Sequence, residues 1–121
     1  MTYCIGIKLD AGLVFTNLID TDQVHGHRKD VDGFHRALRA IDGATADWLE
    51  LLREGDVLIL TADHGVDPAA AHSDHTREHV PLLAVGVPPG RHDGALSDVG
   101  ATVHELLTGR VATDLPGESF A

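Results

Sequence analysis

The chain has 121 residues, of which 43% are hydrophobic and 23% charged, a composition typical of a globular protein and not of a disordered segment. A formal net charge of −10 opposes binding to phosphate backbones, so we expect no nucleic-acid partner. Cys4 is the single cysteine, which excludes an internal disulfide and a cysteine-rich zinc site. No apolar run approaches the roughly 20 residues that span a bilayer, and the start is a poor signal peptide. We therefore expect a cytoplasmic protein without membrane contact.

The beginning of the chain is predicted to form strands. Residues 3–9 alternate loosely between apolar and polar side chains and are compatible with a strand. Residues 13–19 are apolar and rich in branched side chains, and their length suits a buried strand. A polar loop over residues 20–29 is expected to follow.

A helical pattern begins after this loop. Asp30 is a suitable N-cap, and apolar side chains then repeat at helical spacing as far as residue 52. Gly43 interrupts the repeat, so we expect it to divide the segment into two helices. Gly55 is expected to end the segment as a C-terminal glycine.

The remaining elements follow in the second half. Residues 57–62 and 80–87 are apolar runs that predict strands, the first of them a central parallel strand, and a long polar loop over 63–79 separates them. Ser97 is expected to cap a last helix and Gly109 to end it. The tail is expected to be irregular.

This order of elements predicts an α/β fold with a mostly parallel sheet flanked by helices. We expect residues 13–121 to form one domain and residues 1–12 to be an atypical N-terminal segment. Because sites in such sheets form beyond the carboxyl ends of the strands, the loops 20–29 and 63–79 are expected to converge. The chain offers few helices to cover a sheet, so self-association through an exposed face or edge is also expected.

The densest group of metal-binding side chain types lies in the second loop. Four of the nine histidines fall between residues 64 and 79, interleaved with acidic residues. Asp63 and His64 follow directly on a predicted strand, and Gly65 permits the turn that would let both face one site. A carboxylate and an imidazole together suit manganese or zinc. An Asp–His hydrogen bond near a helix cap is the plain structural alternative.

A second group lies in the first loop. Asp22 and His27 are candidate ligands that the turn at Gly26 would bring together, although Asp20 and His25 compete with them on spacing alone. His75 is the candidate that could reach across from the second loop. His72 and His79 compete with His75, and a surface role is open for each of these histidines.

Three stretches, NLIDTDQVHGHRKD, LILTADHGVDP and SDHTREHVPLLAVG, resemble successive C-terminal motifs of phosphopentomutases, which belong to the alkaline phosphatase superfamily. The resemblance runs from about residue 13 to the tail LPGESF. It implies a partial alkaline-phosphatase-like core that carries the C-terminal metal-binding portion of that family.

The resemblance also implies a ligand set. Asp22, His27 and His75 match ligands of one Mn²⁺, and Asp63 and His64 match two ligands of another. It gives no ligand role to the four competing residues: Asp20, His25, His72 and His79. Arg28, Arg77 and Glu78 belong to the motifs, and we expect them to support the loops around the ligands.

The family's reaction interconverts ribose 1-phosphate and ribose 5-phosphate by two-metal phosphoryl transfer, which implies a pentose phosphate as substrate. The motifs that would supply the phosphorylated Thr and the cap domain have no match in this sequence. One metal site is therefore expected to be incomplete, and the chain alone to be inactive. The alternatives are a non-catalytic metal-binding remnant or interaction module, and a metalloenzyme similar to phosphoglycerate mutase or a phosphatase.

The opening, MTYCIGIKLDAGLVF, weakly resembles bacterial proteasome-type peptidases, in which Thr2 would become the N-terminal nucleophile. That similarity stops near Phe15, and the rest of that fold has no counterpart. It therefore does not change the expected function.

Overall fold

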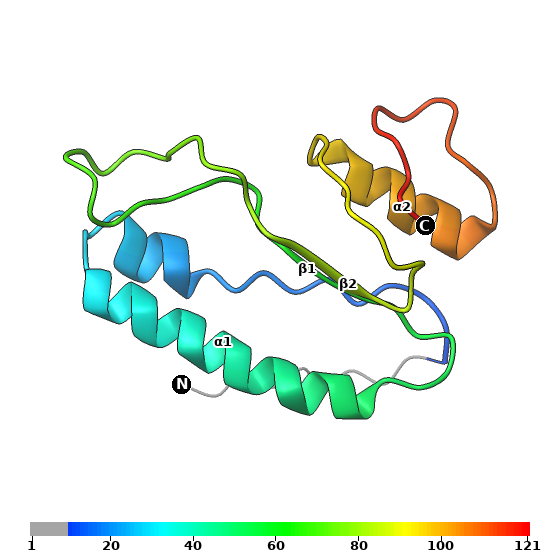
Figure 1. The fold of residues 1–121 in the computed structure, drawn as a ribbon, viewed down its shortest axis with the longest axis horizontal. Coiled ribbons are helices and arrows are strands. Elements are labelled where there is room, and N and C mark those ends of the chain that lie inside the picture. Colours follow the sequence, from blue (N-terminus) through cyan, green and yellow to red (C-terminus); the bar gives the residue numbers. More distant parts are fainter. Residues whose placement is uncertain (1–9) are drawn as a thin grey trace.

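The computed structural model describes residues 10–121 (Figure 1). Five elements follow one another: a π-helix η1 (Asp20–Gly26), α1 (Val31–Leu51), β1 (Leu58–Thr61), β2 (Leu82–Val85) and α2 (Ser97–Thr108). The mixture of helices and strands confirms only that the chain combines both kinds of element, as predicted. The strand predicted over residues 3–9 lies outside the described residues, as does most of the atypical segment 1–12.

The two strands form an antiparallel pair, in which Leu58 lies opposite Val85 and Thr61 opposite Leu82. The loop between them continues the hairpin through an antiparallel bridge between Gly65 and Thr76, so the chain returns alongside itself. A parallel pair would need a crossover, usually a helix, and this loop contains none. The described residues therefore do not form the mostly parallel sheet that the sequence predicted.

Residues 13–19 contain no strand, so that prediction is wrong for the described chain. The segment runs between α1 and the β1–β2 pair in Figure 1 without ladder bonds to a described strand. Its apolar side chains stay exposed, with Leu13 at 53% and Phe15 at 84%. The apolar pattern suits a strand, but a strand also requires a hydrogen-bonding partner, and no described strand supplies one.

Helix α1 begins where the sequence predicted. Asp30 is its N-cap, and the Asp30 side chain accepts a hydrogen bond from the backbone N–H of Gly33 at 2.9 Å. Ala37 and Trp48 bury the inward face of α1. Gly43 does not divide the helix, which contradicts the prediction. A helical glycine costs about 1 kcal/mol relative to alanine, and a helix of this length tolerates that loss.

The end of α1 differs from the expectation. The helix stops at Leu51, because Leu52 adopts an extended conformation with ψ 136°. Gly55 has φ +88° and lies in the following turn, where the N–H of Asp56 donates to the carbonyl of Arg53. Gly55 therefore shapes the turn into β1 and does not cap the helix.

Helix α2 starts at Ser97, but the Ser97 side chain makes no capping bond, contrary to the prediction. Asp98 instead accepts the N–H of Ala95 at 3.0 Å. Gly109 ends the helix as predicted, with φ 68° and its N–H donating to Glu105. The irregular tail folds back along α2, as Figure 1 shows at the C-terminus. None of the helices in residues 10–121 is both long and apolar enough to cross a membrane.

Candidate metal centre

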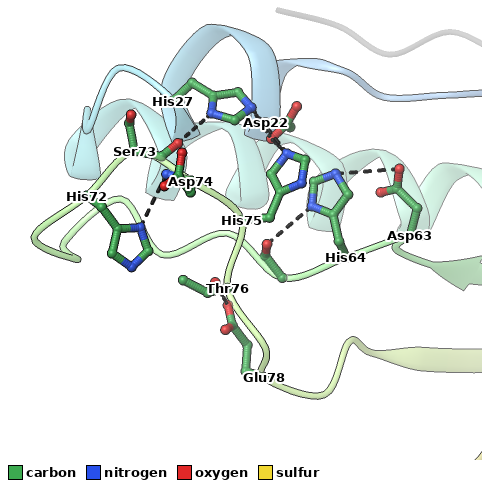
Figure 2. Close-up of polar contacts among 11 residues, drawn as sticks. Asp22, His27, Asp63, His64, His72, Ser73, Asp74, His75, Thr76 and Glu78 are labelled. Carbon is green, nitrogen blue, oxygen red and sulfur yellow. Dashed lines mark hydrogen bonds and ion pairs between the residues drawn. The ribbon is translucent and has the colours of Figure 1, made fainter.

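The two polar loops meet at one end of the molecule. The segment predicted as a loop over 20–29 contains η1, and Gly26 in it packs so tightly that an added Cβ would lie 2.8 Å from Val66 Cγ2. Thr76 donates its N–H to the carbonyl of Gly65 at 3.0 Å, which closes the second loop on itself. Figure 2 shows that Asp22 and His27 from the first loop lie beside His64 and His75 from the second.

Asp22, His27 and His75 place one donor atom each at the corners of a small triangle. His27 Nε2 lies 3.2 Å from Asp22 Oδ1, and His75 Nε2 lies 3.6 Å from the same oxygen. The two Nε2 atoms are 3.3 Å apart. Ligand atoms about 2.0–2.2 Å from a shared ion are separated by about 3–3.5 Å at tetrahedral or octahedral angles. The triangle therefore has the size of one face of a metal coordination shell.

The orientation of His27 is set by the backbone of the opposite loop. Its Nδ1 lies 2.6 Å from the carbonyl oxygen of Ser73, which can only accept a hydrogen bond. Nδ1 therefore carries the proton in the neutral ring, and the lone pair remains on Nε2. This is the arrangement by which proteins fix the tautomer of a metal-binding histidine.

Asp22 Oδ1 provides a test of whether a cation fits. This oxygen is buried and has no hydrogen-bond partner among the described residues, although two imidazole nitrogens lie near it. A carboxylate oxygen buried without a partner is costly. A divalent cation between this oxygen and the two Nε2 atoms would satisfy all three when His75 binds with Nε2 deprotonated, so the donor set fits a metal.

His64 extends the cluster from the second loop. Its ring stacks on that of His75 with centroids 3.5 Å apart, and Asp22, His64 and His75 offer donor atoms within 4.8 Å of one another. Asp63 stands apart from this group. Its side chain is 76% exposed, and its Oδ2 lies 3.6 Å from His64 Nε2 at the edge of the cluster (Figure 2).

The competing candidates lie elsewhere or have other partners. His25 Nδ1 lies 2.9 Å from Asp30 Oδ2, and the pKa of Asp30 is lowered, first by the N–H of Gly33 and then by His25. His72 accepts the N–H of Asp74 and points away from the cluster in Figure 2. Neither Asp20 nor His79 joins the donor cluster among the residues described.

The three supporting candidates differ from one another. Glu78 accepts a hydrogen bond from the hydroxyl of Thr76 at 2.7 Å and touches Gly65. In the described part of the chain, Arg28 and Arg77 form no ion pair. The sequence therefore selected one residue with a visible supporting contact and two without one.

Two contributors were missed from the sequence. The carbonyl of Ser73 orients His27, but a backbone carbonyl leaves no signal in a side-chain pattern. Thr76 joins the loop to Gly65 through its N–H and to Glu78 through its hydroxyl. Its position next to His75 was visible, but nothing in the spacing distinguished it from other threonines.

Comparison with known proteins shows which family the chain belongs to. The model of the metalloenzyme superfamily matches residues 6–109. The chain is 50% identical over 106 residues to a phosphopentomutase of Anaeromyxobacter sp. (strain K), an alignment that covers 83% of this chain and 27% of the relative. It is 48% identical over 119 residues to a phosphopentomutase of Symbiobacterium thermophilum, covering 94% of this chain and 30% of that protein. The chain thus spans less than a third of the length of these curated relatives.

The resemblance to phosphopentomutases is confirmed by these relatives, which match most of the chain. The superfamily match and the cluster of Asp22, His64 and His75 together support divalent metal binding. The assignment of single residues as ligands stays a prediction. The chain belongs to the metalloenzyme superfamily, and within that superfamily it is similar to phosphopentomutases.

Proposed function

We propose that this chain supplies the metal-binding part of a two-metal phosphoryl transfer that interconverts ribose 1-phosphate and ribose 5-phosphate in the cytoplasm. The triangle of Asp22, His27 and His75 carries the proposal, because three donor atoms from two distant loops meet at the spacing of a shared ion. The similarity to phosphopentomutases supports the reaction and the pentose phosphate substrate.

Asp22, His27 and His75 would hold one Mn²⁺, and Asp63 with His64 would contribute to a second. Divalent cations, when bound, polarise phosphoryl oxygens and stabilise the attacking and leaving oxygens of the transfer. Carboxylate and imidazole donors together suit manganese. Ser73 holds the proton on His27 Nδ1, so Nε2 keeps its lone pair directed at the cluster. The stacking of His64 on His75 would keep the two sets of ligands adjacent.

The proposal also concerns what the 121 residues do on their own. Only Asp63 and His64 are assigned to the second ion, and no threonine of the sequence matches the phosphorylated residue of the family. We therefore expect this chain alone to bind Mn²⁺ without interconverting the two ribose phosphates.

Calorimetric titration with Mn²⁺ tests the site. His75→Ala removes one corner of the triangle and should lower the affinity by more than about 100-fold, because loss of an outer partner alone costs about 10–100-fold. His72→Ala is the matched control, since His72 lies in the same loop and points away. Equal binding by wild type and His75→Ala would remove His75 from the site.

A coupled assay for ribose 5-phosphate formation tests the reaction. Metal binding without turnover is the result expected for the 121-residue chain. Binding of no divalent ion by the wild type would refute the metal site itself. Release of phosphate from a generic phosphate ester would instead identify a phosphatase-like activity and contradict the mutase assignment.

A further inference from the structure

Glu78 occupies an unusual place for an exposed acidic side chain. Its Oε1 accepts a hydrogen bond from Thr76 Oγ1 at 2.7 Å. A Cβ atom on Gly65 would lie 2.5 Å from Glu78 Cδ, 2.6 Å from Oε1 and 2.8 Å from Oε2. The carboxylate therefore rests on the α-carbon of Gly65, in space that any larger residue would fill.

Gly65 and Thr76 are the two residues that join the arms of the second loop. They form an isolated antiparallel bridge, in which Gly65 accepts the N–H of Thr76 at 3.0 Å. The Glu78 carboxylate packs against Gly65 and accepts a hydrogen bond from the hydroxyl of Thr76. The carboxylate thus contacts both residues of the bridge and links the two segments of the second loop.

Each residue of the bridge is the direct neighbour of a histidine of the metal centre. His64 precedes Gly65, and the Gly65 carbonyl lies 3.2 Å from His64 Nδ1. His75 precedes Thr76, and the two imidazole rings stack at 3.5 Å with an interplanar angle of 16°. A shift of Gly65 relative to Thr76 would therefore change the distance between the His64 ring and the His75 ring.

We propose that Glu78 is a positioning residue of the metal centre, which clamps Thr76 onto Gly65 and thereby holds His64 against His75. Glu78 acts through the bridge and is not among the clustered donor atoms. Its effect on metal affinity rests on the proposed function, whereas its effect on the ring contact does not.

The ring contact is tested in the metal-free protein. Nuclear Overhauser effects between the His64 and His75 rings should be clear in the wild type and weak in Glu78→Ala and Thr76→Val. Glu78→Gln should retain them, because its amide oxygen still accepts from Thr76 Oγ1. Glu50→Ala, a change of an exposed glutamate in α1, is the control and should leave them unchanged. Unchanged effects in Glu78→Ala and Thr76→Val would overturn the proposal.

Calorimetry with Mn²⁺ gives the second readout. Glu78→Ala and Thr76→Val should each weaken binding by about tenfold, and Glu78→Gln by much less, as for other outer partners of metal ligands. Equal losses in Glu78→Gln and Glu78→Ala would contradict a hydrogen-bonded clamp. If the wild type binds no Mn²⁺ while the ring contact still depends on Glu78, the positioning role stands and the proposed metal function fails.

Discussion

Asp22 is the side chain whose surroundings most favour a bound cation. One of its carboxylate oxygens is buried without a hydrogen-bond partner among the described residues, and two imidazole nitrogens approach it within 3.6 Å. The same carboxylate in water would be fully hydrated. Removing that hydration without replacing it costs free energy, which the fold tolerates and a bound cation would recover.

Alanine substitutions at Gly26 and Gly43 are predicted to change the free energy of unfolding in opposite directions. An alanine at position 26 would place its Cβ 2.8 Å from the carbonyl oxygen of Thr21 and from Val66 Cγ2. We expect Gly26→Ala to lower the free energy of unfolding by about 1–3 kcal/mol through overpacking. Urea unfolding followed by Trp48 fluorescence measures this change. No loss of stability would mean that the contact with Val66 yields easily.

Gly43→Ala is the counterpart in α1. A Cβ at position 43 meets nothing within 4 Å, and the residue lies within a continuous helix. Alanine should therefore raise the free energy of unfolding by up to about 1 kcal/mol. The same urea experiment applies. A loss of stability here would indicate that the helix is interrupted at Gly43, as the sequence alone suggested.

The elements that were predicted well are those with local causes. Asp30 caps α1 through its own side chain, and Gly109 ends α2 because it accepts a left-handed conformation. Both effects depend on neighbouring residues in the sequence. The convergence of the loops at 20–29 and 63–79 was also expected, but from the carboxyl edge of a parallel sheet that the described residues do not form.

The elements that were predicted poorly depend on distant partners. Residues 13–19 have the composition of a strand, but the ladder bonds of a strand come from elsewhere in the chain. The strand β2 returns antiparallel to β1 beyond a loop that the Gly65–Thr76 bridge closes, and composition does not reveal that bridge. Asp63 was expected beside His64, yet its side chain is 76% exposed, because adjacent residues at a strand end need not share a direction.

Helix α2 and the C-terminal tail meet at a buried ionisable side chain, Asp98. Asp98 is buried and accepts the N–H of Glu118 at 2.9 Å, and Thr102 accepts that of Phe120 at 3.0 Å. The pKa of Asp98 is lowered from its usual value of 3.8, first by the N–H of Glu118 and then by His92. The ionised carboxylate is therefore the form that fastens the tail.

The sign of the pH dependence follows from that lowered pKa. The stabilisation is complete above the usual pKa of 3.8 and is lost as the pH falls through the lower value of the folded state. Hydrogen exchange of the tail amides should thus show loss of protection on acidification. Asp98→Asn should lower protection already at neutral pH and abolish this step. Asp93→Asn, which affects an exposed carboxylate paired with Arg91, should retain it. An acid step that persists in Asp98→Asn would contradict the assignment.

Considered as a whole, the molecule leaves much apolar surface uncovered. Ala37, Trp48 and Ala101 are the buried hydrophobic residues among those described, whereas Leu83 is 63% and Val85 47% exposed. Both lie on β2, which pairs along one side with β1. Exposed apolar strands with unpaired edges favour association.

We therefore propose that the chain associates with itself at raised concentration. Light scattering after size-exclusion chromatography should show a mass above 12.9 kDa that increases with concentration. Leu83→Lys should shift the distribution towards the monomer, because a charge opposes pairing along an exposed strand. Leu115→Lys, the same substitution at an exposed leucine in the tail, serves as the control. A monomer at every concentration would argue against this surface.

The proposed function requires loops 20–29 and 63–79 to bind a divalent cation together. Titration of the protein with small amounts of Mn²⁺, followed by proton NMR, locates the ion, because Mn²⁺ broadens the resonances of the nearest histidine rings most. We expect the resonances of His27, His64 and His75 to broaden together at the lowest Mn²⁺ additions, while those of His72, His92 and His104 stay sharp. Broadening that begins at His72 or His104, or that spreads equally over all the rings, would contradict it.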